Sequence, residues 1–147
     1  MMSRSATLLI VLAALLASAL SSCVRCIDIR LFNNSGDRIT VVGINPTDER
    51  RTWEIDNGDS AIVWYQYRWE ILKGAATWAY GPGKVSYPGP KYASGGYFGC
   101  LHLAAQLGPA GEIWMLAADA QGVVKAPPPQ PVGYPVIPDN ASGSVAR

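Results

Sequence analysis

Apolar and polar residues alternate along much of the chain, which is typical of strands with one buried face. Within 27–32, apolar residues at odd positions alternate with Asp28 and Arg30, and the turn-forming run 33–37 (Asn-Asn-Ser-Gly-Asp) follows. A second apolar stretch, 39–42, comes directly after this run. Because Asn and Gly tolerate the positive φ angles of tight turns, the pattern predicts a β-hairpin of 27–32 with 39–42.

The longest alternating stretch is 62–71, which predicts one extended strand. One of its two faces is apolar throughout and carries Val63, Tyr65, Tyr67, Trp69 and Ile71. The opposite face begins apolar at Ile62 and Trp64 and ends polar at Glu70. Shorter strands are predicted at 53–55 and 76–80.

A second hairpin is predicted from 101–107 and 112–117, joined by Gly108-Pro109-Ala110-Gly111. The alanines of 101–107 would also suit a helix, but its leucines recur with a spacing of two, which favours a strand. The preceding segment, 81–99, is rich in Gly, Pro and Tyr and is interpreted as a long loop, either a surface insertion or a binding loop. Six prolines in 126–147 predict an extended, polyproline-like tail.

These six or seven short strands predict an all-β fold, a small antiparallel β-sandwich or open barrel with a proline-rich C-terminal tail. Periodicity alone does not choose between sandwich and barrel. The globular domain is expected to span 23–125, and a chain of this size buries about two-thirds of its unfolded surface in one core.

Residues 1–22 have the three-part layout of a secretory signal: Arg4 near the start, an apolar run over 6–20, then small residues. The segment Leu20-Ser21-Ser22-Cys23 resembles the lipobox of bacterial lipoproteins at all four positions. This resemblance implies that residues 1–22 are removed as a lipoprotein signal peptide and that the thiol of Cys23 carries a diacylglycerol group. Several acyl chains make a stable membrane anchor, where a single chain is marginal.

An ordinary signal with an incidental Cys23, or an uncleaved anchor helix, is the alternative. The residue after the cysteine is Val24 and not aspartate, which by resemblance to the sorting rule of enteric bacteria implies the outer membrane, on the side that faces the periplasm. The expected partner of the anchor is therefore the membrane of a bacterial cell envelope.

The charge of the mature chain is balanced, because there are twelve Lys and Arg against eleven Asp and Glu and Arg4 lies in the signal. Nucleic-acid binding needs a basic face, and the adjacent pair Arg50 and Arg51 follows Asp48 and Glu49 directly. Nucleic acid is therefore not an expected partner.

Beyond Cys23, the chain has Cys26 and Cys100, an even pair in what would be an oxidising periplasm. We predict a disulfide between them, with two free thiols or a crosslink between molecules as the alternatives. On the alternation above, this bond would place Asp28 near His102.

His102 is the one histidine of the chain, and no known serine-hydrolase, phosphate-loop or zinc-protease motif accompanies it. We interpret an Asp28–His102 pair as structural, and we expect no catalytic residue, no metal site and no cofactor. The turn at Asp56, Asn57 and Asp59 lacks the ligand spacing of a calcium loop and is interpreted as a plain turn.

Five tryptophans are numerous for this length. Aromatic side chains on a β-scaffold either pack the core or stack against sugars and partner proteins. Trp64 and Trp78 lie beside loop or polar positions and are the candidates for exposure and ligand contact.

The segments Leu31-Phe32-Asn33-Asn34-Ser35-Gly36 and Gln130-Pro131-Val132-Gly133-Tyr134-Pro135 look like parts of small proteobacterial lipoproteins of unassigned function, a resemblance that implies no catalytic residues. We expect a non-catalytic envelope lipoprotein that binds another protein or supports an envelope assembly. A glycan- or peptidoglycan-binding module and a small periplasmic enzyme inhibitor that uses the 81–99 loop are the alternatives.

Overall fold

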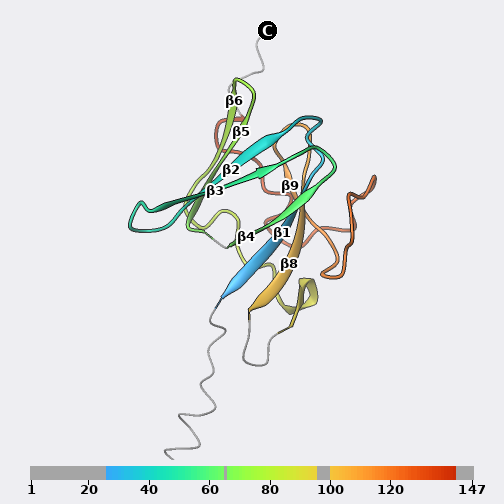
Figure 1. Cartoon of the computed structure of the whole chain (residues 1–147). Coiled ribbons are helices and arrows are strands. Elements are labelled where there is room, and N and C mark those ends of the chain that lie inside the picture. The colour runs from blue at the N-terminus through green and yellow to red at the C-terminus, as the bar shows by residue number, and fades with distance from the viewer. Residues whose placement is uncertain (1–25, 65, 96–99, 142–147) are drawn as a thin grey trace, which may run out of the picture.

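The computed structural model describes residues 26–64, 66–95 and 100–141, which form a sandwich of two β-sheets (Figure 1). Sheet A has the strand order β4-β1-β8-β7, with β9 paired to a second part of β8, and sheet B has the order β3-β2-β5-β6. The strands are β1 (Ile27–Asn33), β2 (Ile39–Ile44), β3 (Arg50–Ile55), β4 (Ser60–Trp64), β5 (Arg68–Lys73), β6 (Ala76–Tyr80), β7 (Ala93–Ser94), β8 (Leu101–Leu107) and β9 (Ile113–Met115), with one short 3-10 helix, η1 (Pro90–Tyr92). The predicted all-β fold is therefore confirmed, and of the two architectures that the sequence left open the structure is the sandwich.

The core lies between the two sheets and is built from alternate residues of each strand, as the period of two requires. Sheet A contributes Ile29, Leu31, Val63, Leu103, Ala105 and Leu107, and sheet B contributes Ile39, Val41, Trp69, Ile71 and Tyr80. All of these side chains are at most 2% exposed. The residues between them on each strand face away from the core.

The predicted hairpin of 27–32 with 39–42 is wrong. β1 pairs with β4 and β8 in sheet A, whereas β2 pairs with β3 and β5 in sheet B, so the segment between them carries the chain from one sheet to the other. The buried Asn33 explains why: its amide donates to the carbonyls of Asp37, at 2.7 Å, and Ile55, at 2.9 Å. These bonds hold the segment after β1 in the path that leads from sheet A to sheet B. A hairpin turn would instead have kept both strands in one sheet.

The predicted single strand over 62–71 is also wrong, because β4 belongs to sheet A and β5 to sheet B. Val63, Trp69 and Ile71 nevertheless reach the core, as their shared face predicted. Tyr67, which was predicted on the same face, lies between the two strands and is 45% exposed. A chain that crosses between two sheets can keep the same side chains pointing inward, since both sheets face one core. The alternation alone therefore could not reveal the break between 64 and 68.

The second predicted hairpin is confirmed, with Ala105 of β8 opposite Met115 of β9 in antiparallel register. The strand interpretation of 101–107 is confirmed with it. β1 and β8, in contrast, run parallel from Ile27 opposite Leu101 to Asn33 opposite Leu107, which the prediction of an antiparallel sandwich did not foresee. Parallel neighbours need a long connection, and here it contains all of sheet B.

The described part of the proline-rich tail, 126–141, packs against the domain, a question that the sequence left open. Val136 forms two backbone hydrogen bonds with Ile113 and is 2% exposed. The side-chain amide of Gln130 accepts from the N–H of Met115 at 2.7 Å and donates to its carbonyl at 3.0 Å. Gln130 therefore takes the place of a strand partner beside β9.

Candidate functional site

The outer face of sheet A, which we define as the face of β1, β4 and β8 turned away from sheet B, carries the candidate site. Arg30 of β1 lies opposite Ile62 of β4 and Ala104 of β8. Asp28 lies opposite both Trp64 and His102. The strand registers thus bring charged and apolar side chains from three separate segments into adjacent rows.

Asp28 and His102 form a direct pair, with Oδ1 of the carboxylate 2.7 Å from Nδ1 of the imidazole. The Asp28 side chain is 17% exposed and the His102 side chain 55% exposed. Their closeness was predicted from the Cys26–Cys100 bond, and it is confirmed. The carboxylate fixes the orientation of the ring, because it occupies one of the two ring nitrogens.

The disulfide between Cys26 and Cys100 is present, with the Cα atoms 4.5 Å apart. It lies immediately before the first residue pair of the parallel β1–β8 ladder, and the N–H of Leu101 donates to the carbonyl of Cys26 at 3.0 Å. The bond therefore fixes the register that sets Asp28 against His102.

A segment after β9 covers part of the outer face and makes one wall of the site. Phe32, Ala104 and Leu116 form a small second core there, with Ala120, Val123 and Val124 packed on it. Gln106 holds this wall in place, since its amide donates to the carbonyl of Val124 at 3.1 Å and accepts from its N–H at 2.8 Å. This layer was not predicted from the sequence, because the burial of Gln106, which is 3% exposed, is visible only in the structure.

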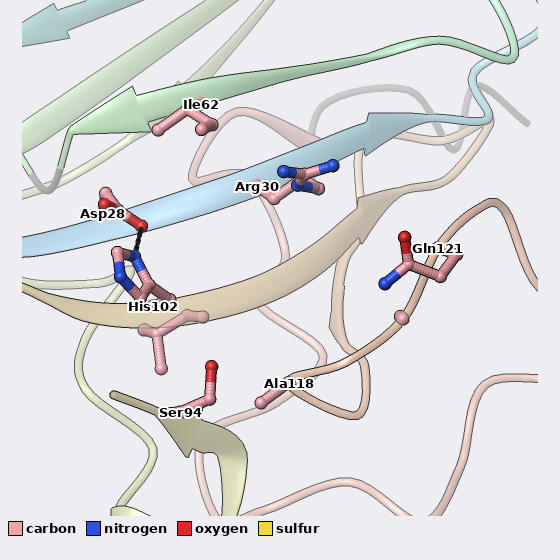
Figure 2. Close-up of a pocket in the computed structure, with 9 residues that line it drawn as sticks. Asp28, Arg30, Ile62, Ser94, His102, Ala118 and Gln121 are labelled. Atoms are coloured by element: carbon pink, nitrogen blue, oxygen red, sulfur yellow. Dashed lines mark hydrogen bonds and ion pairs between the residues drawn. The ribbon is translucent and has the colours of Figure 1, made fainter. Parts of the chain in front are cut away.

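Between this wall and β4 lies a groove of about 200 Å³ (Figure 2). His102 and Arg30 stand on its floor, Ile62 on one side, and Ala118 and Gln121 on the wall. Within the part of the chain that the structure describes, the Arg30 guanidinium makes no hydrogen bond or ion pair. The groove therefore offers one cation without a partner next to polar and small apolar groups.

Ser94 also lines the groove, because it lies opposite His102 in the β7–β8 register. Asp28, His102 and Ser94 thus follow one another across three adjacent strands. Figure 2 shows the Ser94 hydroxyl well apart from the His102 ring, and no hydrogen bond joins them. A serine nucleophile needs its base within hydrogen-bond reach, and this arrangement does not provide it.

Trp64, one of the two predicted ligand-contact residues, is 55% exposed. The guanidinium carbon of Arg51 lies 4.7 Å from the centre of its ring, at the distance of a cation–π contact. Together with Ile27 and the Cys26–Cys100 disulfide, Trp64 lines a second hollow of about 130 Å³, which also touches Asp28. The expectation that Trp64 is exposed is confirmed.

Trp78, the other predicted contact residue, is half-buried and packs against the core. Gly111 permits this, because a Cβ atom on it would lie 2.6 Å from the indole. The carbonyl of Gly111 also accepts a hydrogen bond from the buried hydroxyl of Tyr80. Burial, with a smaller effect of the Glu112 carboxylate, raises the pKa of Tyr80 well above its ordinary value, so this hydroxyl remains a donor. Trp78 is therefore part of the packing around β6.

Cys23, the predicted lipidation site, and the whole segment 1–22 lie outside the described residues. Across 26–64, 66–95 and 100–141, no helix is long and apolar enough to cross a membrane. The same residues contain no group of three or more His, Cys, Asp or Glu placed to hold a metal ion.

A scan against protein-family models finds no match for this chain, and searches of curated proteins and of solved structures find none either.

Proposed function

We propose that this protein is a non-catalytic lipoprotein of the bacterial cell envelope, anchored through Cys23, which binds a partner protein in the groove on the outer face of sheet A. The anchor is supported by the lipobox Leu20-Ser21-Ser22-Cys23 and by the start of β1 at Ile27, four residues after the cysteine. The outer membrane, facing the periplasm, is the proposed location because Val24 and not aspartate follows the cysteine, which resembles the sorting pattern of enteric bacteria.

The single observation that carries the binding function is the unpaired guanidinium of Arg30 in the groove. Arginine binds carboxylates and phosphates through two parallel hydrogen bonds, and an acidic side chain is the group of a protein partner that offers this match. Asp28, two residues away on the same face, binds His102 and makes no ion pair with Arg30.

The size of the groove supports a protein partner over a long glycan. Its volume of about 200 Å³ is below the roughly 300–1,000 Å³ of sites that enclose a drug-sized molecule. One inserted side chain fits a space of this size, as in the pockets that take single anchor residues at protein interfaces. We assign the groove to an acidic side chain of the partner.

A glycan remains the second candidate, favoured by the exposed indole of Trp64 beside this groove. The inhibitor alternative has less support. The described part of its candidate loop packs against the domain. The N–H of Gly83 donates to the carbonyl of Tyr67 at 2.9 Å, and Val85 belongs to the core and is 4% exposed.

The anchor is tested by intact-mass measurement of the protein purified from membranes. The mature chain should begin at Cys23 and carry acyl mass, and the Cys23→Ser variant should lack that mass. A wild-type chain that keeps residues 1–22 without lipid would refute the anchor.

The groove is tested by NMR titration with N-acetylglutamate amide, which presents one acidic side chain, and with the neutral N-acetylglutamine amide. The acid should shift the Arg30 Nε–H and His102 ring signals, whereas the neutral compound should not. Arg30→Gln should abolish the shift of the His102 ring signals, and Arg50→Gln on β3, which removes an exposed arginine outside the groove, should keep it. An equal shift of the His102 ring signals in wild type and Arg30→Gln would refute the assignment. A shift of the Trp64 signals on addition of chito-oligosaccharides, with no response to the acid, would favour the glycan.

A further inference from the structure

The end of the domain that carries Cys26 must lie close to the membrane if Cys23 is acylated. Three residues of chain span at most about 11 Å from Cys23 to Cys26, since a fully extended chain covers 3.3–3.6 Å per residue. The headgroup layer of one leaflet is roughly 5–8 Å thick, the difference between the whole bilayer and its hydrocarbon core shared by two sides. Cys26 is therefore within about one headgroup layer of the lipid surface.

Trp64 lies at this same end of the domain. It is opposite Asp28, two residues into the strand pairing from Cys26, and it lines the hollow formed by the Cys26–Cys100 disulfide. In Figure 1 the starts of β1 and β8 lie together at one end of the molecule, while the β5–β6 turn lies at the other. The exposed indole is thus close to the point where the anchor leaves the domain.

The chemistry of this surface matches a membrane interface. Tryptophan prefers the headgroup region, where its ring contacts apolar chains and its N–H finds a hydrogen-bond acceptor. Arg51, stacked on Trp64, forms no ion pair with any described residue. A basic side chain near an anionic lipid surface contributes favourably to binding, so its charge is available to lipid phosphates.

We infer that Trp64 and Arg51 form a second membrane contact, in which the indole inserts among phospholipid headgroups and the guanidinium binds their phosphates. This inference rests on the proposed anchor at Cys23. The lipid holds the domain to the membrane, and the Trp64–Arg51 contact fixes its orientation. One consequence is that the Arg30 groove, on the same outer face, is held at a defined height above the bilayer.

The test uses the lipidated protein, with its acyl mass verified, in vesicles of phosphatidylethanolamine and phosphatidylglycerol whose acyl chains are brominated near the headgroup. Bromine quenches tryptophans that reach the interface. Wild type should lose part of its emission, and Trp64→Phe should lose no emission on the same vesicles. Trp78→Phe is the matched control, because Trp78 lies on β6 and packs against the core, and it should be quenched like wild type.

Arg51→Gln keeps the indole and provides a second, independent variant. Its quenching should be weaker than that of wild type and should no longer increase with the share of phosphatidylglycerol. Identical quenching of acylated wild type and Trp64→Phe would overturn the membrane contact while leaving the anchor intact. A chain without acyl mass would overturn the anchor and the contact together.

Discussion

Removing the side-chain amide of Asn33 should destabilise the whole sandwich, because this amide holds the chain where it crosses from sheet A to sheet B. Asn33 is 0% exposed. Its Nδ2 donates to the carbonyls of Asp37 and Ile55 at 2.7 and 2.9 Å, and its Oδ1 accepts from the N–H of Ser35 at 3.0 Å. Both N–H groups of the amide therefore donate, and its oxygen accepts one of the two hydrogen bonds that it can take.

The magnitude follows from these three bonds. An intramolecular hydrogen bond contributes about 1 kcal/mol net, and a buried group left without a partner costs roughly 1–3 kcal/mol. Asn33→Ala deprives the Ile55 carbonyl and the Ser35 N–H of this partner, so we expect a loss of about 3 kcal/mol in the free energy of unfolding. Asn33→Asp keeps the size of the side chain but places an oxygen against two carbonyl oxygens, and its loss should be at least as large.

Urea unfolding of the purified protein, followed by tryptophan fluorescence, measures these losses. Asn34→Ala is the matched control, because it removes the same amide from the next residue, whose side chain makes no hydrogen bond among the described residues. The control should lose less than about 0.5 kcal/mol, as surface substitutions generally do. If Asn33→Ala loses no more than Asn34→Ala, the role assigned to the crossing is refuted.

Two further predictions concern the disulfide and the tail. Reducing the Cys26–Cys100 bond, which joins residues 74 apart, should lower the free energy of unfolding by up to about 4.5 kcal/mol on the chain-entropy model; an unchanged urea midpoint under reductant would contradict this. The hydrogen bonds from Lys84 and from the N–H of Gly81 lower the pKa of Asp139. The unfolded chain then binds more protons, so this contribution is complete above the ordinary aspartate pKa of about 3.9 and is lost as pH falls through the lowered value. The stability difference between wild type and Asp139→Asn, measured from pH 2 to 7, should shrink in that acidic window, and a constant difference would contradict the assignment.

The local alternation of the sequence predicted the all-β class and many of the residues that the strands bury, but not where each strand begins and ends. Val63, Trp69 and Ile71 reach the core as their spacing predicted, and the second hairpin and the Asp28–His102 pair followed from the same period of two. Strand periodicity reports which side chains face inward, and this information is contained in a few neighbouring residues.

Only the tertiary structure decided which strands are neighbours. The segments 27–32 and 39–42 have the pattern of a hairpin, yet the buried amide of Asn33 sends them to opposite sheets. The groove likewise depends on the covering segment after β9, which Gln106 holds over the outer face of sheet A. A side chain that points inward satisfies the same alternation in either sheet, so pairing is set by long-range hydrogen bonds and packing that local periodicity does not record.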